Sequence, residues 1–256
     1  QYIKTLKRFL HSIVASKDGV LRTTYKPANG RTDGRRYTNG MRLQGVAENI
    51  RNFIVKDCGK DYDMGNCFPT LLLHLCKKHI NNPSVYPLLT DYVHNRSSVL
   101  ENNEITKTDI LVNMNKDNAR PKNEYLKKFV KEQSRIKDLL IPYCKDYTDF
   151  KSTNEQNPIS STICQVLCVI EDRILTRATE SFRDVALIFD GFICFEGGDL
   201  TTLNTNTEEY GIIWKVKPFT TTIKIPEDFK YNDYKLQKDI FEKENHIIRN
   251  PLCYMR

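Results

Sequence analysis

Hydrophobic and polar positions alternate along the chain in stretches that predict strands and amphipathic helices in a definite order. Residues 18–42 are rich in glycine, proline and basic side chains, which indicates a basic strand-and-turn segment. Residues 61–80 pass from the strand-like DYDM into LLLHLCKKHI, whose leucines and basic end predict a helix. Residues 84–155 are charged, with apolar positions at helical spacing, so we expect amphipathic helices there.

The second half of the chain predicts a long helix followed by several strands. The helix opens at the Asn-Pro pair 157–158, with Ser160 or Ser161 as its cap, and a turn leads to the apolar strand DVALIF. Asp190 and Gly191 then predict a hairpin into FICFE, and GIIWKVKPF and TTTIKI are two further strand candidates. Together these elements predict an α+β fold around an antiparallel sheet.

Composition and charge narrow the class of protein. The chain has 256 residues, 39% of them hydrophobic, which is enough for a substantial core, and it has no apolar run long enough to span a membrane. The N-terminal QYIKTLKRFL lacks a secretory segment, so we expect a soluble intracellular protein. Lys and Arg exceed Asp and Glu by 39 to 32, and this net charge of +7 suits an anionic partner such as nucleic acid without requiring one.

The eight cysteines are too sparse for a disulfide scaffold, and we expect reduced thiols. Cys164 and Cys168 stand four apart within an apolar helical pattern, which favours core cysteines on one face of a helix. His74, Cys76 and His79 are spaced so that they do not converge on a helix, and no metal site is expected there.

Two aspartates stand at the ends of apolar strands, Asp63 in YDM and Asp190 in LIFDG. An aspartate at a strand end most often caps a turn, so each one alone says little. On one antiparallel sheet, however, a strand-end Asp and a hairpin-tip Asp can lie side by side, and two like charges then need cations between them. Mg²⁺ prefers oxygen ligands of this kind, and two such ions support nucleotidyl transfer.

Four blocks that surround these aspartates follow one another between residues 18 and 200. The first is DGVLRTTYKPANGRTDGRRY with RLQGVAENIRNFIV, and the others are DYDMGNCFPTLL, NPISST and LIFDGFICFE. In this order they resemble the family A segments GRLSS, NLQNIP and IRRAF, then polymerase motif A, the NPIQGT helix start and motif C. The chain therefore resembles the superfamily of family A DNA polymerases and single-subunit phage RNA polymerases. It is most similar to the small TV-Pol group of virophages and mobile elements, which is usually fused to a helicase.

The resemblance implies a reduced right-hand polymerase, with a palm built on an antiparallel sheet and with helical fingers. Two Mg²⁺ ions, or Mn²⁺ in their place, are then held by Asp63 and Asp190, with the backbone carbonyl of Met64 as a further ligand. Phe68 is followed by Pro69, as in the Tyr-Pro pair of family B polymerases, and a bulky ring there excludes a ribose 2′-hydroxyl. Deoxynucleoside triphosphates are therefore the expected substrates.

The fingers are expected to supply cations to the triphosphate. Lys107 stands at a predicted helix start and is similar to the motif B lysine that meets the incoming nucleotide. Family A has an arginine four residues earlier, where this chain has Asn103, and Arg96 is the substitute candidate. Asn66 and Phe68 complete the expected nucleotide-binding set.

The resemblance also implies contacts to the phosphate backbone of template and primer, which basic and polar side chains make without reading sequence. The motif C histidine is replaced by Phe189 and the helix glutamine by Ser160, so contacts to the primer end differ from those of the family. The residues expected to contact template or primer are Arg35, Arg36, Gln44, Arg51 and Asn157.

We expect a single polymerase domain and, beyond it, a linker toward a helicase region. No Walker A sequence is present, so ATP-driven unwinding is expected to reside outside this chain. The expected parts are a domain over 1–245, with a thumb remnant and template–primer segment at 1–60, a palm at 61–80 and 156–230 and fingers at 81–155, then the linker at 246–256.

The leading hypothesis is a template-directed DNA polymerase that replicates a virus or mobile element. Its expected partners are a DNA template and primer, deoxynucleoside triphosphates and a covalently linked helicase, at a viral replication site in the host cell or in the virion, without a membrane. Three alternatives stay open: a primase or primase-polymerase that starts chains de novo, a non-catalytic nucleic-acid-binding module of a helicase, and a nuclease. A nuclease could use the same paired carboxylates, but it would leave Lys107 without a purpose.

Overall fold

The structure is a computed structural model that describes residues 2–16, 21–28, 31–40 and 42–220. The strand expected at TTTIKI, apart from its first residue, and the linker expected at 246–256 lie outside these ranges. None of the helices in the described ranges combines the length and the apolar character that a membrane crossing requires.

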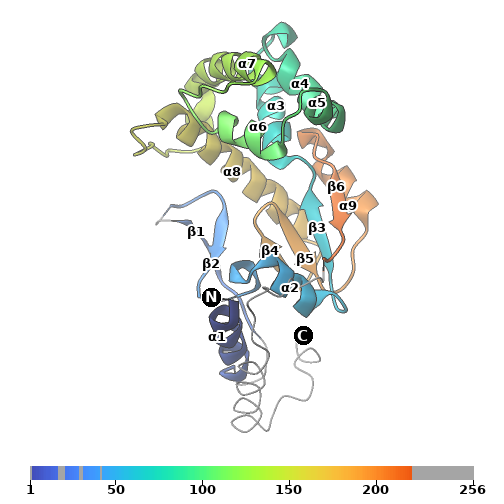
Figure 1. The fold of residues 1–256 in the computed structure, drawn as a ribbon. Helices are drawn as coiled ribbons and strands as arrows, with labels where there is room; N and C mark the ends of the chain where they lie inside the picture. Colours follow the sequence, from blue (N-terminus) through green and yellow to red (C-terminus); the bar gives the residue numbers. More distant parts are fainter. Residues whose placement is uncertain (1, 17–20, 29–30, 41, 221–256) are drawn as a thin grey trace.

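A four-stranded antiparallel sheet lies at the centre of the molecule, with the strand order β4-β5-β3-β6 (Figure 1). The order confirms the predicted α+β class with an antiparallel sheet. It places strands distant in sequence side by side, because β3 is flanked by two strands from the C-terminal part of the chain. The bounds are β3 (Lys60–Met64), β4 (Val185–Ile188), β5 (Gly191–Cys194) and β6 (Trp214–Lys217).

The two faces of the sheet differ because side chains alternate along each strand. Tyr62 stacks on Phe192 with ring centroids 5.2 Å apart, and Phe192 meets Trp214 at 5.5 Å. These rings belong to the main hydrophobic core, which continues into the helices. Asp63 follows Tyr62 and therefore projects from the opposite face, where a smaller cluster forms around Val55.

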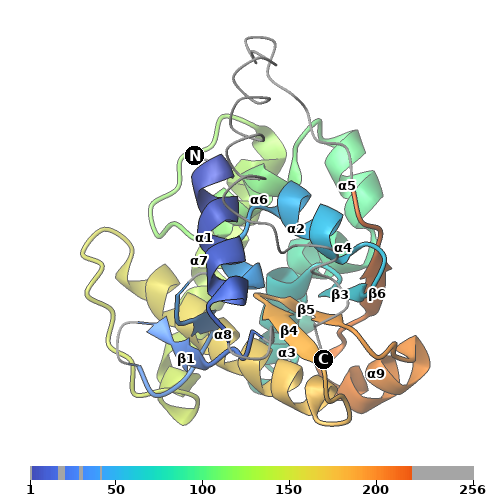
Figure 2. The same ribbon diagram turned by 90° about the horizontal axis from the view of Figure 1, so that it is seen from below.

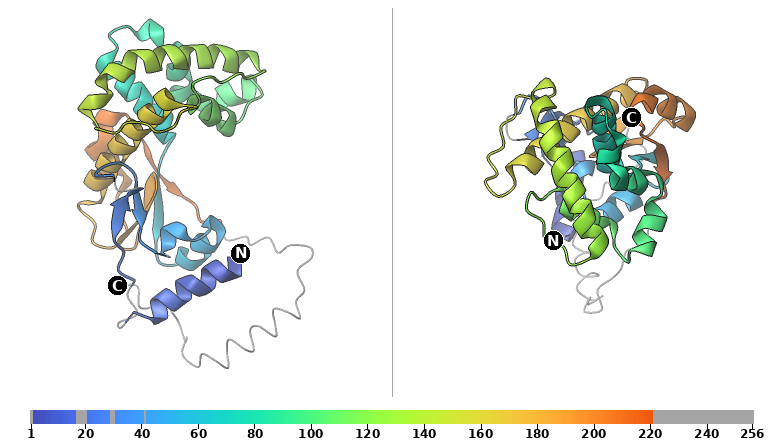
Figure 3. Two further views of the ribbon diagram at one scale, coloured as in Figure 1. Left: turned by 90° about the vertical axis from the view of Figure 1, so that its left-hand side faces the viewer. Right: turned by 90° about the horizontal axis from the view of Figure 1, so that it is seen from above.

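Helices cover the first face and extend beyond the sheet. In Figures 1 and 3 the helices α4 to α7 stand together at one end of the molecule, and α8 runs from them down to the sheet. The predicted helical stretch 84–155 is confirmed up to residue 146, whereas residues 147–155 are irregular. The bounds are α3 (Cys67–His79), α4 (Pro87–His94), α5 (Arg96–Asn102), α6 (Lys107–Met114), α7 (Glu124–Leu140) and α8 (Pro158–Thr179), with 3-10 turns η3 (Pro83–Val85) and η4 (Ile141–Asp146).

The N-terminal segment lies at the end of the sheet remote from α4 to α7 (Figures 2 and 3). The basic strand-and-turn segment forms the predicted structure, a two-stranded antiparallel hairpin. The Tyr25 hydroxyl accepts the backbone N–H of Leu187 at 2.9 Å and so ties this hairpin to the main sheet. The elements are α1 (Tyr2–Val14), β1 (Tyr25–Pro27), β2 (Arg36–Thr38), η2 (Leu43–Gly45) and α2 (Glu48–Val55).

The expected cap of α8 is wrong. The helix begins at Pro158 with Asn157 as its cap residue, and neither Ser160 nor Ser161 caps it. The Asp117 carboxylate, which is 42 and 43 residues earlier in the sequence, accepts the N–H groups of Ile159 and Ser160 at 2.9 and 2.7 Å. A tertiary acceptor thus satisfies the helix start, as free N–H groups there require.

The polar stretch after β5, which was not expected to be regular, contains a helix, α9 (Leu200–Thr207), followed by η5 (Glu208–Tyr210). Asp199 caps α9 by accepting the N–H groups of Thr201 and Thr202. Burial of Leu203 then holds a segment with weak intrinsic helix propensity in place.

The hairpin between β4 and β5 is confirmed, but its turn lies one residue earlier than the Asp-Gly pair. Ile188 pairs with Gly191, so Phe189 and Asp190 form the two-residue loop. Phe189 takes the strained position, with φ of 53°, at a cost of about 1–3 kcal/mol. Gly191 is needed because a Cβ atom there would lie 2.3 Å from the carbonyl oxygen of Tyr62.

Candidate functional site

Asp63 and Asp190 come together at one end of the central strand pair. Asp63 pairs with Gly191 across β3 and β5, and the N–H of Met64 donates to the backbone carbonyl of Asp190 at 3.1 Å. Both aspartates are half-buried. Within the described part of the chain, neither carboxylate accepts a hydrogen bond or forms an ion pair.

The two carboxylates repel each other. Burial, and then the negative charge of Asp190, raises the pKa of Asp63 to about 6, while the positive charges of Lys217 and Lys107 act in the opposite direction. Asp61, two residues earlier on the same face, is almost fully buried, and desolvation raises the pKa of its carboxyl as well. The site therefore holds negative charge at neutral pH that the nearby cations offset only in part.

This partly offset charge predicts that Asp63→Asn stabilises the metal-free protein at neutral pH. A pKa raised from 3.8 to about 6 means that stability is lost as the pH rises through 6. At 1.36 kcal/mol per pKa unit, reduced by solvent screening, we expect a gain of about 1–2 kcal/mol at pH 7.5. Urea unfolding at pH 7.5 and pH 3.5 measures the gain, which should vanish at the lower pH. A gain of equal size at both pH values would contradict the charge explanation.

A divalent cation fits the donor set at this position. Carboxylate oxygens without a positive partner are the ligands that Mg²⁺ prefers. The Met64 side chain is buried in the core, so only its backbone carbonyl remains as a ligand. Among the residues that the structure describes, no group of three or more His, Cys, Asp and Glu side chains could hold a metal ion. Further ligands therefore have to be water or substrate oxygens.

The expected nucleotide-binding residues differ in their distance from the aspartates. Lys107 is exposed at the first position of α6, as predicted, and its charge acts on Asp63. Asn66 directly precedes α3 with φ of 54°, and both polar atoms of its amide are buried without a hydrogen-bond partner in the described structure. Arg96 begins α5, and its charge acts on the phenol of Tyr92 instead.

Arg35 is half-buried and bound to a buried acid. Its guanidinium donates two hydrogen bonds, of 2.7 and 2.6 Å, to the carboxylate of Glu171, which is fully buried on α8. Its carbon centre lies 5.3 Å from the ring of Phe68 and 5.6 Å from the ring of Phe189. The hydrogen bond with Glu171 counteracts burial and raises the pKa of Arg35, with a smaller contribution from Asp190. Arg35 thus connects α3, the hairpin turn and α8.

The other residues expected to contact template or primer also have partners within the chain. Arg36 pairs with Asp172 and donates to the hydroxyl of Thr176. The amide of Gln44 is buried and bonds to backbone groups of Thr38, Arg36 and Leu187. The remaining two are Arg51, which is buried and donates to the carbonyl of Val46, and Asn157, whose side chain accepts the N–H of Asp117. Their contacts to nucleic acid stay a prediction.

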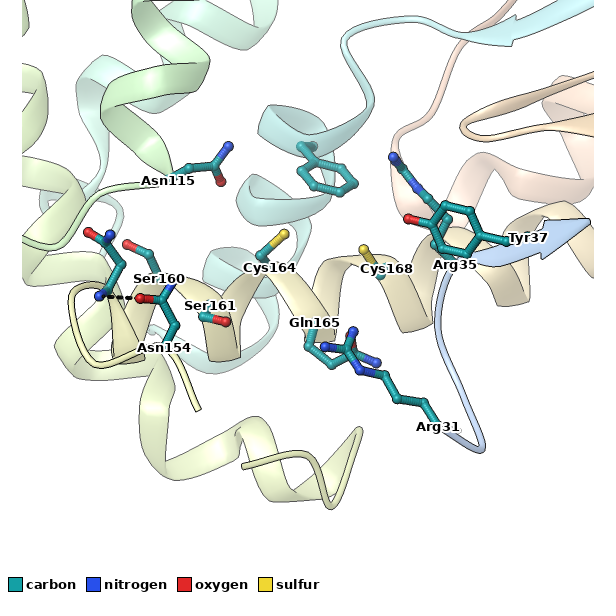
Figure 4. A pocket seen from close by; sticks show the side chains of 12 residues that line it. Arg31, Arg35, Tyr37, Asn115, Asn154, Ser160, Ser161, Cys164, Gln165 and Cys168 are labelled. Carbon is teal, nitrogen blue, oxygen red and sulfur yellow. Dashed lines mark hydrogen bonds between the residues drawn. The ribbon is translucent and has the colours of Figure 1, made fainter. Parts of the chain in front are cut away.

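A pocket of about 360 Å³ opens between the basic hairpin, α3 and α8 (Figure 4). Phe68 lines it from α3, and the thiols of Cys164 and Cys168 line it from α8. The expectation of core cysteines is therefore wrong: both are half-buried, and they face a cavity instead of packed side chains. Arg31 borders the same pocket, where it donates to Gln165 and lies 4.3 Å from the ring of Phe150.

Sequence reasoning missed Glu171 as a site residue. A glutamate within the apolar run VLCVIEDRIL was a usable signal, because an acid at a buried helical position needs a cationic partner. Its partner lies 136 residues earlier, which no local pattern indicates.

Comparison with known proteins gives one distant likeness. No family model matches the chain, and no solved structure matches it. It is 26% identical over 231 residues to the putative helicase V13 of the Sputnik virophage, an alignment that covers 81% of this chain and 29% of that protein. The chain thus spans under a third of the relative's length. The chain is distantly similar to a virophage protein, in agreement with the viral or mobile-element context that the resemblance implies.

Proposed function

We propose that the chain is a template-directed DNA polymerase that uses a divalent metal ion to join deoxynucleotides. The observation that carries the proposal is the meeting of Asp63 and Asp190 on neighbouring strands, with no cation partner among the described residues. Two acids that come from a strand end and a hairpin tip, far apart in sequence, create a local negative charge that a Mg²⁺-bound triphosphate can relieve.

The side chains around the aspartates have consistent parts in this reaction. Mg²⁺ bound at Asp63 and Asp190 would activate the primer hydroxyl and stabilise the leaving pyrophosphate. Lys107 is exposed and its charge lowers the pKa of Asp63, so in this reaction it neutralises negative charge on the triphosphate. The amide of Asn66 has no hydrogen-bond partner in the described structure but is buried, so its expected contact with the nucleotide stays a prediction.

The experiment that tests this function is incorporation of labelled deoxynucleotides into a primed single-stranded template. Extension that requires both the template and Mg²⁺ is the expected result. Omitting the primer, and offering ribonucleotides in a parallel reaction, separates a polymerase from a primase. Shortening of the primer without extension would instead indicate a nuclease.

A second candidate is a nucleic-acid-binding module of a larger helicase polypeptide. It is favoured by the name of the virophage relative, a putative helicase. That protein is more than three times as long as the part of it that aligns with this chain. Salt-dependent binding of DNA without any incorporation would support this candidate over the polymerase.

Phe68 is expected to select the sugar of the nucleotide. Its ring lines the pocket and is half-buried beside Arg35, so it can meet a ribose 2′-hydroxyl. Phe68→Ala should raise the kcat/KM ratio of ribonucleotide to deoxynucleotide by at least about tenfold, since a steric clash of roughly 1.4 kcal/mol or more is removed. Phe68→Tyr, which keeps the ring, is the control. An unchanged ratio in Phe68→Ala would remove the sugar role.

A further inference from the structure

The pocket beside the proposed catalytic site contains a pair of thiols that nothing in the proposed reaction uses. Cys164 and Cys168 lie one helical turn apart on α8, and both sulfur atoms face the cavity (Figure 4). Cys164 also lines a second, smaller pocket between α8, α6 and α7. A half-buried thiol on the wall of an open pocket is accessible to a small reagent, whereas a packed core thiol is not.

The surroundings of Cys164 favour its thiolate. A hydrogen bond with the Cys168 thiol is the largest cause that lowers the pKa of Cys164, and the nearby cations of Arg35 and Arg31 act in the same direction, whereas burial and the carboxylate of Glu171 oppose them. The pKa of the neighbouring Cys168 thiol is raised instead, because the pair shares one negative charge.

The other described cysteines differ in this respect. Burial raises the pKa of each, and none of them lines this pocket. They are Cys58, Cys67, Cys76, Cys144 and Cys194.

We propose that Cys164 is a thiol-modification site that takes a small anionic disulfide of the glutathione type. In the reaction the Cys164 thiolate attacks one sulfur of the reagent. A new S–S bond forms to Cys164, the S–S bond of the reagent breaks, and one glutathione thiolate leaves and takes up a proton from water. The guanidinium of Arg31 lines the pocket and donates to the neutral amide of Gln165, so its charge supplies positive potential that attracts the anionic reagent.

The helix keeps this adduct from being resolved by Cys168. Side chains at i and i+4 on a helix have Cβ atoms about 5–6 Å apart, whereas a disulfide needs roughly 3.5–4.5 Å. Cys168 therefore supports the thiolate of Cys164 without readily closing an internal bond with it.

The adduct projects into the cavity that Phe68 and Arg35 also line. Its consequence, that nucleotide or nucleic acid is excluded and extension stops until a thiol reductant removes the adduct, rests on the proposed function. The modification itself does not, because its mass can be measured whether or not the chain is a polymerase.

The test is to incubate the full chain with glutathione disulfide at pH 7.5 and to follow the adducts by intact mass and peptide mapping. We expect one glutathione moiety on Cys164, formed at least about threefold faster than at Cys58, a half-buried cysteine whose pKa is raised. Cys253, outside the described residues, is followed on its own peptide. Cys164→Ser should abolish the adduct, Cys168→Ala should slow it, and Cys168→Ser, which keeps a hydrogen-bond donor, should retain most of the rate.

Faster modification of Cys58 or Cys168, or an internal Cys164–Cys168 disulfide as the main product, would overturn the proposal. If Cys164 is modified but no preparation extends a primer, the proposed function fails while the modification site stands. If extension is seen and is insensitive to the adduct, the site stands but its control of the reaction does not.

Discussion

If the chain is the proposed polymerase, we expect primer extension to fall at least about 10³-fold in Asp63→Asn and in Asp190→Asn, with binding of primed DNA retained. Each substitution removes one of the two carboxylates that meet across β3 and β5. Losing roughly 4 kcal/mol of metal-assisted stabilisation of the transition state corresponds to this factor, at 1.36 kcal/mol for each tenfold change. Steady-state incorporation at saturating Mg²⁺ measures the effect, and fluorescence anisotropy with labelled DNA checks binding.

The double variant should be no slower than either single variant, because the two acids act as one unit. Asp61→Asn is the matched control, since it removes an acid from the same strand and the same face of the sheet. Asp61 is only 6% exposed and pairs across the ladder with Lys217, so it is not available to a metal ion. We expect Asp61→Asn to keep far more activity than Asp63→Asn. Full incorporation by either Asp63→Asn or Asp190→Asn refutes the proposed reaction.

Breaking the Arg35–Glu171 pair should cost about 3–5 kcal/mol of folding free energy. Glu171→Ala leaves a guanidinium without its two hydrogen bonds, and Arg35→Ala leaves a carboxylate that is 0% exposed. For a domain of this size the loss corresponds to a fall in Tm of roughly 10 °C. Urea unfolding followed by circular dichroism measures it.

Burial already raises the pKa of Glu171, and loss of Arg35 removes the main opposing interactions. The folding free energy lost in Arg35→Ala should therefore become smaller as the pH falls and the carboxyl of Glu171 takes up a proton. The double variant Arg35→Met with Glu171→Leu should recover much of the stability, because it leaves no unpaired buried charge. If the single variants are as stable as the parent chain, the pair has no structural role.

The same variants distinguish the observed pairing of Arg35 from the expected contact with a nucleic-acid phosphate. A phosphate contact predicts that the salt dependence of DNA binding weakens by about one ion on substitution, with little change in stability. The ion pair with Glu171 instead predicts a loss of stability, with little change in the salt dependence of DNA binding. We expect this second outcome, because the hydrogen bonds to Glu171 already occupy the guanidinium and it lies against the rings of Phe68 and Phe189.

Local patterns were enough to identify the elements that contain the proposed catalytic acids. The strand that carries Asp63 and the helix after it were predicted correctly from the pattern of apolar and polar residues, and the hairpin at Asp190 was predicted from the Asp-Gly pair, although its turn lies one residue earlier. The start of α6 at Lys107 was also predicted, and its Thr106–Asp109 capping box accounts for it. Such features depend on residues within a few positions of one another, so the sequence carries them directly.

Features that depend on distant partners were not predictable in this way. The cap of α8 comes from Asp117, and α9 forms where composition favours irregular structure because Leu203 is buried and Asp199 caps it. The turn at Phe189 is displaced from the Asp-Gly pair because β4 and β5 pair in a register that leaves Gly191 against the backbone of Tyr62. In each case tertiary packing outweighs the local preference.

The sequence by itself determined which residues could do chemistry: two strand-end aspartates, a lysine at a helix start and a phenylalanine five residues after the first aspartate. Only the tertiary structure decided which of them meet. In that structure Asp63 lies beside Asp190, and Arg35 pairs with Glu171. Cys164, which helical periodicity assigned to the core, lines a pocket. The physical reason is that periodicity specifies which face of an element is apolar, whereas strand order and buried charge pairing depend on residues more than 100 positions away.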